Sequence, residues 1–584
     1  MMMLSRRLSA LPRRLQSSPQ WRFYSDSPKK PSFRNQLYDS TARRITQEKA
    51  QQKEWLAAGQ ATGERPRKAS SAVTAVLALV AVAGASYYLG SQSVTAPSTA
   101  STAPLPSVSP PNHNVTKPNL EASWADFVAI LGKENVSTAI DDRERHATSP
   151  WSSHHSEVPP PFLILYPSTT EEVSQIAKIC HDRRIPMTPY SGGTSLEGHF
   201  APTRGGVCID FRRMDKILEV HEDDLDVVVQ PAVGWEDLNE HLRQYNMFFP
   251  PDPGPGAMIG GMVGTGCSGT NAARYGTMKD WVLSLTVVLA DGTIIKTRQR
   301  PRKSSAGYDL TRLFVGSEGT LGLVTEATLK LHTKPPHTSV AVSSFRDISS
   351  AARTVSAAAK AGLQLAAIEL LDDVQMKCIN ASGTTSRMWR EQPTLFLKFS
   401  GTQSGVKEQI AAVQKLAKQH GADSFTFAAN EHECDELWSA RKEALWSVMA
   451  LKRHDNDVVW TTDVAVPLSR LPEIVDETKK DIEKSGLLGA IVGHVGDGNF
   501  HAILMFNENT ERKIAEDLVH GMVKRAVEME GTVTGEHGVG LVKRGYLESE
   551  LGSGTVDTMR RLKLALDPLC LLNCDKVVRM EAGK

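Results

Sequence analysis

Apolar residues recur with a helical period in the stretch that follows Ser168. Ser168 with Glu171, or Thr169 with Glu172, has the spacing of a capping box, in which side chains satisfy free backbone N–H groups at a helix start. Apolar positions then return every three or four residues, and Pro186 closes the stretch. The pattern predicts a helix that starts near Ser168 and buries one face.

Shorter apolar runs follow, and their length and β-branched content predict strands. They lie at residues 207–211, 217–221 and 227–230, before a helical pattern over 235–245. The Pro-Pro pair at 335–336 then marks a domain boundary. Beyond it, helical stretches alternate with strand-like ones: 349–361, 395–399, 407–419, 464–466 and 471–484. We expect an α+β protein with one domain over 120–335 and an α/β cap domain over 336–584.

The segment Gly493–His501 has two histidines, His494 and His501, on either side of a Gly-Asp-Gly turn, with apolar runs before and after it. The pattern predicts a strand, a bend and a second strand, so that the two imidazoles meet. Glu536 and His537 follow in a second glycine-bracketed segment. Two imidazoles and a carboxylate suit a catalytic metal site with open positions. At this point a hydrolytic site, or ordinary turn histidines, remain open alternatives.

Two glycine-rich loops precede these histidines. The loop at 189–195 is made of small residues, which lets backbone N–H groups approach an anion such as a pyrophosphate. Residues 264–269 fit the G-x-G-x-x-G pattern of dinucleotide-binding folds. That pattern requires a strand in front of it, but four prolines at 250–255 exclude a central strand. We therefore reject a Rossmann fold and a nicotinamide cofactor.

The first 119 residues have the pattern of a targeting sequence, a membrane anchor and a flexible linker rather than that of a folded core. Residues 1–24 are rich in arginine and serine and lack acidic residues, which is typical of a mitochondrial presequence. Residues 71–90 are uncharged and long enough to span a bilayer, with basic residues only on their N-terminal side. We expect an inner-membrane helix whose following chain faces the intermembrane space. The Pro/Ser/Thr-rich stretch 91–119 predicts a flexible linker.

Composition narrows the classes of function. Lys and Arg number 67 against 66 Asp and Glu, so the chain has no basic excess that would indicate nucleic-acid binding. The 7 cysteines form no C-x-x-C pair, which excludes a zinc ribbon and gives no sign of a disulfide framework.

Several motifs carry a resemblance to a known family. Residues 189–198, 250–254, 266–277 and 313–322, together with 493–501 and 535–540, are similar to the FAD-linked oxidases. These have a vanillyl-alcohol-oxidase-type (PCMH-type) FAD-binding domain and an FAD-linked oxidase C-terminal domain. The resemblance runs from about residue 150 to the end of the chain. The residues that it implies for FAD binding are Tyr190, Ser191, Gly192, Gly193, Thr194, Ser195, Pro253, Gly260, Gly261, Gly266, Ser268, Gly269, Asn271, Tyr275, Gly276, Val324 and Asn573.

The resemblance also implies an activity. It makes His494, His501 and Glu536 the ligands of one divalent metal, His537 the catalytic base and Arg441 the clamp for a substrate carboxylate. Zn is the expected metal, with Mn or Fe as alternatives. The implied reaction is the oxidation of a D-2-hydroxy acid, D-lactate, to its 2-keto acid by FAD, with electrons passed to cytochrome c.

Alternatives to D-lactate oxidation remain open from the sequence. One is oxidation of D-2-hydroxyglutarate, and another is a membrane-anchored flavoprotein that serves as a scaffold or sensor. His199 lies just past the first glycine loop, so covalent attachment of FAD is a further alternative. The chain also departs from the family near its end, where Asn573 is followed by Cys-Asp-Lys instead of Pro-Gly-Lys.

Overall fold

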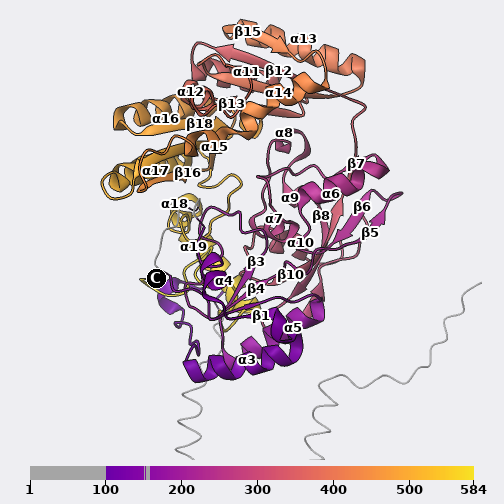
Figure 1. Cartoon of the computed structure of the whole chain (residues 1–584), viewed down its shortest axis with the longest axis vertical. Helices are drawn as coiled ribbons and strands as arrows, with labels where there is room; N and C mark the ends of the chain where they lie inside the picture. Colours follow the sequence, from indigo (N-terminus) through magenta and orange to yellow (C-terminus); the bar gives the residue numbers. More distant parts are fainter. Residues whose placement is uncertain (1–99, 150–151, 153–157, 584) are drawn as a thin grey trace, which may run out of the picture. The chain divides into compact units, whose positions relative to one another are not determined.

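The computed structural model describes residues 100–149, 152 and 158–583 (Figure 1). The predicted presequence (1–24) and the predicted membrane helix (71–90) lie outside the described residues. Within the described ranges, no helix is both long and apolar enough to cross a membrane.

Residues 100–116 pack against the folded part of the chain, although the sequence predicts a flexible linker over 91–119. Ala103 is buried, and its backbone N–H donates to the carbonyl oxygen of Asp557 at 2.9 Å. A ring nitrogen of His113 bonds the carbonyl oxygen of Cys570 at 3.0 Å. Helix α3 (Lys117–Leu131) begins directly afterwards. These bonds to the C-terminal segment hold residues that composition alone assigns to a tether, so the linker prediction is wrong for this part.

Helix α5 (Thr170–Arg183) confirms the predicted helix start. Thr169 Oγ1 accepts the backbone N–H of Glu172 at 3.1 Å, and the N–H of Ser168 donates to the Glu172 carboxylate at 2.6 Å. Helices α3 and α5 share one apolar core with a four-stranded sheet of order β1-β2-β4-β3. Its strands are β1 (Val136–Ser137), β2 (Leu163–Leu165), β3 (Met187–Tyr190) and β4 (Val207–Asp210). Strands β2 and β3 run parallel to β4, and the end of β3 opens the first glycine loop.

A second, five-stranded antiparallel sheet has the order β5-β6-β10-β8-β9. Its strands are β5 (Ile217–His221), β6 (Asp226–Val229), β8 (Val282–Val288), β9 (Ile294–Lys296) and β10 (Leu323–Lys330), and β7 (Met247–Phe248) pairs separately with β11 (His332–Thr333). Short helices pack on its apolar side: α6 (Trp235–Leu242), α7 (Ile259–Thr265), α9 (Met278–Trp281) and α10 (Leu310–Phe314). The G-x-G-x-x-G segment starts inside α7, which ends at Gly266 with φ 68°. A helix rather than a strand therefore leads into it, as the rejection of a Rossmann fold requires.

The cap is built on an eight-stranded sheet of order β15-β12-β14-β13-β18-β19-β16, with β17 paired to β19. Every neighbouring pair in it is antiparallel. The strands are β12 (His337–Phe345), β13 (Ala367–Leu371), β14 (Thr394–Gly401), β15 (Ala422–Phe427), β16 (Asp457–Thr461), β17 (Val464–Ala465), β18 (Leu488–Gly493) and β19 (Asn499–Asn507).

Both faces of this sheet are covered by helices, because apolar side chains point alternately to each face of its strands. Val340 and Val342 belong to one core and Ala341 to the other. One face carries α11 (Ile348–Lys360), α13 (Gln403–Gln419), α16 (Leu471–Ser485) and α17 (Arg512–Glu528). The other carries α12 (Asp373–Ser382), α14 (Glu431–Lys442) and α15 (Ala444–Met449). The predicted cap helices and strands are thus confirmed.

After α18 (Leu547–Leu551) and α19 (Ser553–Leu566), the chain returns to the first region (Figure 1). The backbone of Met187, at the start of β3, bonds Leu571 and Asn573 at 2.8 Å each. Leu571 and Leu572 are buried in the core of the four-stranded sheet. The sequence predicts one C-terminal domain over 336–584, but the last part of this segment packs into the first domain.

Candidate functional site

A cavity of about 830 Å³ lies between the glycine loops of the first region and the cap. Its size is that of a site for a large cofactor together with a small substrate. The first region contributes the loop after β3, the segments around Pro253 and α7, and the turn that precedes β10. The cap contributes α14, α15 and the strands β18 and β19.

The wall from the first region is built for close approach of backbone. A Cβ on Gly192 would lie 2.7 Å from the carbonyl oxygen of Gly256, and one on Gly260 would lie 2.7 Å from Pro231 Cβ. Gly193 has φ +65°, a conformation that side chains rarely adopt. Two loops that touch through bare backbone can direct N–H groups toward a phosphate group. This cradle fits the pyrophosphate and planar ring system of FAD.

Most residues predicted to bind FAD line this cavity. They are Tyr190, Ser191, Gly192, Gly193, Thr194, Ser195, Pro253, Gly260, Gly261, Gly269, Val324 and Asn573. The Nδ2 of Asn573 donates to the carbonyl oxygens of His199 and Glu318, while its Oδ1 is buried without a hydrogen-bond partner. The altered turn that follows Asn573 therefore leaves this side chain at the cavity, with a free acceptor.

Five predicted cofactor residues do not line the cavity: Gly266, Ser268, Asn271, Tyr275 and Gly276. Gly266 and Gly276 provide positive φ, 68° and 78°, at the ends of α7 and α8 (Ala272–Tyr275). Asn271 donates to the carbonyl of Pro250, and Tyr275 packs edge-on against the rings of Phe248 and Trp281. These residues shape the wall from behind it.

Strands β18 and β19 bring the two histidines together, as predicted. Val492 pairs with His501 across the antiparallel ladder, and His494 follows directly after the end of β18, with its ring centroid 5.6 Å from that of His501. The ring of His494 bonds Glu369 Oε1 through Nδ1 (2.9 Å), and that of His501 bonds the carbonyl of Thr462 through Nδ1 (2.9 Å). Partners at both Nδ1 atoms leave the Nε2 atoms for a shared ligand.

Glu536 completes this group from a separate loop. Its Oε1 lies 2.9 Å from His494 Nε2 and 3.4 Å from His501 Nε2, while its Oε2 accepts the hydroxyl of Ser268 at 2.7 Å. Ser268 thus contacts a metal-ligand candidate rather than the cavity. Burial alone would raise the pKa of Glu536, but His494 and His501 hold it well below its usual value. His494 and His501 are buried and Glu536 is partly buried, and their nitrogen and oxygen atoms can together hold one metal ion.

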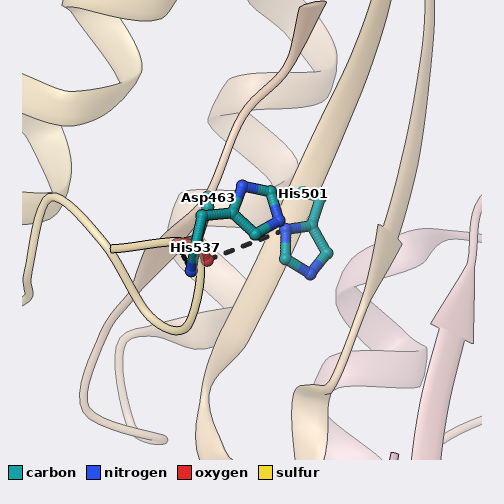
Figure 2. A group of neighbouring side chains, drawn as sticks. All are labelled: Asp463, His501 and His537. Atoms are coloured by element: carbon teal, nitrogen blue, oxygen red, sulfur yellow. Dashed lines mark hydrogen bonds and ion pairs between the residues drawn. The ribbon is translucent and has the colours of Figure 1, made fainter. Parts of the chain in front are cut away.

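Figure 2 shows a second group of possible ligands, Asp463, His501 and His537, which shares His501 with the first group. The Asp463 carboxylate is already engaged. Its Oδ2 accepts the backbone N–H groups of Glu536 (3.0 Å) and His537 (2.9 Å), and its Oδ1 accepts Asn499 Nδ2 (2.7 Å). Asp463 therefore fixes the loop that carries Glu536 and His537, and this structural role explains its position better than metal ligation does.

His537 stacks on His501 with ring centroids 5.0 Å apart and lines the cavity. Its Nδ1 lies 3.3 Å from Glu197 Oε1. Burial alone would lower the pKa of His537, but the carboxylates of Asp463 and Glu197 outweigh burial and raise it above its usual value. The buried Lys543 ammonium lies 3.2 Å from both carboxylates, so their charges are compensated.

Arg441, from α14, also lines the cavity. Its Nε donates to Glu369 Oε2 at 2.6 Å, and its Nη2 lies 3.4 Å from His494 Nε2. One carboxylate, Glu369, therefore orients both the predicted substrate clamp and a predicted metal ligand. Burial alone would lower the pKa of His494, but Glu369 and Glu536 raise it well above its usual value.

Sequence reasoning missed Glu369, Asp463, Glu197 and Lys543. Glu369 did leave a signal, because it is the one charged residue in the apolar run Ala-Ile-Glu-Leu-Leu of β13. A carboxylate inside a fully buried strand needs a partner, and this need could have indicated a site.

Comparison with known proteins agrees with this geometry. Residues 161–298 match the FAD binding domain family, and residues 334–577 match the family of FAD linked oxidases, C-terminal domain. A mitochondrial D-lactate dehydrogenase (cytochrome) of Kluyveromyces lactis is 52% identical over 77% of this chain and 79% of its own. Its counterpart in Saccharomyces cerevisiae is 49% identical over 83% and 84%, and that of Arabidopsis thaliana 46% over 76% and 78%.

Solved structures show the same fold at low sequence identity. The 4-ethylphenol oxidase from Gulosibacter chungangensis has a TM-score of 0.67 at 18% identity, covering 81% of this chain and 99% of its own. The p-cresol methylhydroxylase has a TM-score of 0.66 at 16% identity, covering 80% and 98%. The expected PCMH-type FAD-binding fold is confirmed. The chain belongs to the FAD-linked oxidases.

Proposed function

We propose that this protein is a mitochondrial FAD-dependent D-lactate dehydrogenase that oxidises D-lactate to pyruvate and passes the electrons to cytochrome c. The observation that carries the proposal is a shared cavity: the glycine loops of the FAD-binding domain and the group His494, His501 and Glu536 line the same space. The relatives named D-lactate dehydrogenase (cytochrome), at 46–52% identity, support the substrate and the electron acceptor.

His494, His501 and Glu536 are proposed to hold one divalent ion. Both imidazoles have Nδ1 engaged and Nε2 within 3.4 Å of the same Glu536 oxygen. His501 Nδ1 must donate to the Thr462 carbonyl, so its Nε2 carries a lone pair, as does the ionised Glu536 oxygen opposite it. Two acceptors that face each other are stabilised by a cation between them. Two nitrogens and one oxygen suit Zn, with Mn and Fe as alternatives.

When bound, FAD supplies a two-electron acceptor and the divalent ion supplies a Lewis acid for the substrate hydroxyl. The chain's own residues bind the substrate and move the proton. Arg441, held by Glu369, pairs with the substrate carboxylate and sets its orientation. His537 takes the hydroxyl proton on Nε2, because its Nδ1 faces Glu197.

The cap wall near the histidines favours a small monocarboxylate. Val492 and Ile503 share a sheet face with His501 and line the cavity with Trp438. Arg441 contacts the histidine group, whereas Lys442 lines the cavity but is an exposed side chain. A second substrate carboxylate, as in D-2-hydroxyglutarate, would have to recruit Lys442. D-lactate places only a methyl group against this apolar wall.

The proposal includes an inner-membrane anchor with the enzyme facing the intermembrane space. Its support is the sequence of residues 1–24 and 71–90 and the mitochondrial names of the relatives. Alkaline carbonate extraction of isolated mitochondria should leave the protein in the membrane pellet. Protease added after rupture of the outer membrane alone should digest it. Release into the soluble fraction would contradict the anchor.

The decisive experiment is anaerobic flavin reduction by a panel of D- and L-2-hydroxy acids, with and without a chelator. We expect D-lactate to bleach the flavin absorbance, L-lactate to leave it unchanged, and chelation to stop the reaction until a divalent metal is restored. Faster bleaching by D-2-hydroxyglutarate would reassign the substrate. A flavin that no member of the panel bleaches would indicate the scaffold or sensor.

A further inference from the structure

Glu197 lies two residues after the first glycine loop, within the motif 189–198 of the FAD-binding domain, but its carboxylate contacts the cap. It is fully buried, and its Oε1 lies 3.3 Å from His537 Nδ1 and 3.2 Å from Lys543 Nζ. His537 and Lys543 both come from the C-terminal loop that follows α17. Burying a charged side chain costs free energy unless polar or charged partners compensate it, and here another domain supplies those partners.

The backbone around these residues fixes their relative positions. The N–H of Leu541 donates to the Glu197 carbonyl at 2.8 Å, and a Cβ on Gly540 would lie 2.1 Å from that same carbonyl oxygen. The Glu318 carboxylate accepts the N–H groups of Val539 (2.6 Å) and Gly540 (2.8 Å). The segment that carries His537 is therefore held against the FAD-binding domain by backbone contacts, and only a glycine fits at 540.

Asp463, the other carboxylate near His537, serves a different purpose. It bonds the backbone N–H of His537 and the Thr534 hydroxyl (2.7 Å), and it shares the Lys543 ammonium with Glu197. Asp463 fixes the loop, and Glu197 is the carboxylate with a bond to the imidazole ring. Lys543 compensates both charges, because two buried carboxylates without a cation would destabilise the fold.

We propose that Glu197 is the positioning residue of the catalytic base: it accepts the Nδ1–H of His537 and thereby keeps the lone pair on Nε2, which faces the substrate. A carboxylate has no hydrogen to give, so the ring nitrogen must be the donor, and the second nitrogen is then free to accept a proton. The inference rests on the proposed function, since it assigns the tautomer of the base in that reaction. It also means that the FAD-binding loop sets the geometry of proton transfer.

The test uses full-length holoenzyme with Glu197→Gln and Glu197→Asp. The Gln amide can donate to Nδ1 and so favour the opposite tautomer, which has no lone pair on Nε2. Stopped-flow flavin reduction by D-lactate should then slow about 100-fold, the lower end of what a general base contributes. The apparent Kd for D-lactate should stay within about threefold, and FAD and metal content should stay at wild-type values. Glu197→Asp keeps the charge and should recover at least about tenfold of the loss.

Asp372→Asn is the matched control, because Asp372 is also a fully buried carboxylate paired with a lysine, Lys479 (2.7 Å), but does not line the cavity. It should lower Tm and leave the reduction rate near wild type. Near-normal reduction by Glu197→Gln would overturn the proposal. A rate loss that merely follows loss of FAD would also overturn it and assign Glu197 to the FAD loop alone.

A second readout separates this inference from the proposed function. In 15N-histidine spectra of the holoprotein, the His537 signal, assigned by its loss in His537→Asn, should report Nδ1–H in wild type and Nε2–H in Glu197→Gln. If wild type shows this tautomer but D-lactate does not reduce its flavin, the proposed substrate is wrong and the positioning role stands. An unchanged His537 tautomer in Glu197→Gln would overturn the positioning role whatever the substrate.

Discussion

The two walls of the cavity differ in which atoms form the binding surface, backbone atoms in one and side-chain atoms in the other. On the FAD-binding side the critical atoms belong to the backbone, and glycines such as Gly192 and Gly260 allow loops to touch. On the cap side the critical atoms belong to side chains of α14, β19 and the loops after β18 and α17, and each has a buried partner, as His494 has in Glu369. The first wall therefore depends on the absence of side chains, and the second on side chains held in fixed orientations.

This difference predicts that a substitution in one wall removes only the ligand that this wall binds. Removing a ligand atom of the proposed metal from the cap should cost the metal and the reaction but leave the flavin in place. Adding an atom to a glycine loop should cost the flavin but leave the metal in place. Direct bonds join the walls at Ser268–Glu536 and at Glu197–His537. These bonds are the places where the separation could break down.

The largest effect is expected for Glu536→Gln. An amide is a poor replacement for an ionised ligand, so the metal should be lost, and with it several kcal/mol of transition-state stabilisation, or about a thousandfold in kcat/KM. Elemental analysis and flavin absorbance should show protein without metal but with full FAD. Glu528→Gln, on an exposed position of α17, is the control and should match wild type. Loss of FAD together with the metal would show that the two walls are not independent.

Next in size is Glu369→Gln. Its carboxylate holds both His494 and Arg441, so the variant should loosen the metal about 10- to 100-fold, in line with other partners of metal-ligating histidines. Titration of the metal-free holoenzyme with Zn, followed by the return of flavin reduction, measures the change. An unaltered Zn affinity with a raised KM for D-lactate would mean that Glu369 serves the arginine alone.

Gly192→Ala tests the opposite wall. The new Cβ would lie 2.7 Å from the Gly256 carbonyl, so one loop must shift, and FAD should bind about tenfold more weakly, since this costs on the order of 1–2 kcal/mol. Fluorescence titration of the apoprotein with FAD measures it. Gly521→Ala, in α17 with open space around the new Cβ, should leave FAD affinity unchanged and raise helix stability by up to about 1 kcal/mol. Metal content should be normal in both variants.

The smallest effect is expected away from both walls. Asp347 caps α11 by accepting the backbone N–H of Ser350 at 2.7 Å. Asp347→Ala should lower the free energy of unfolding by about 1 kcal/mol, with no change in kcat, KM, FAD or metal. Thermal denaturation of the holoenzyme measures the change. A loss of activity in this variant would mean that the site responds to general weakening of the cap. The losses in the other cap variants could then not be assigned to the side chains removed.

The sequence predicted local features well. Features that depend on neighbours within a few residues can be read from the sequence pattern. They are the cap of α5, the strands around residues 207–230 and the proximity of His494 and His501. Glu369 and Asp463 were missed because their partners lie far away in sequence. Gly266 and Gly276 have positive φ where helices end, and the sequence alone does not distinguish such a glycine from one required for close contact with a ligand.

The backbone bonds between Met187 and the segment at Leu571–Asn573 have a consequence for folding. The first sheet is complete only when this segment, from far along the chain, docks beside β3. Folding of the FAD-binding domain therefore depends on residues that follow the cap in the sequence. A fragment limited to residues 100–335 would lack this edge and the Asn573 side chain, and it should not retain flavin.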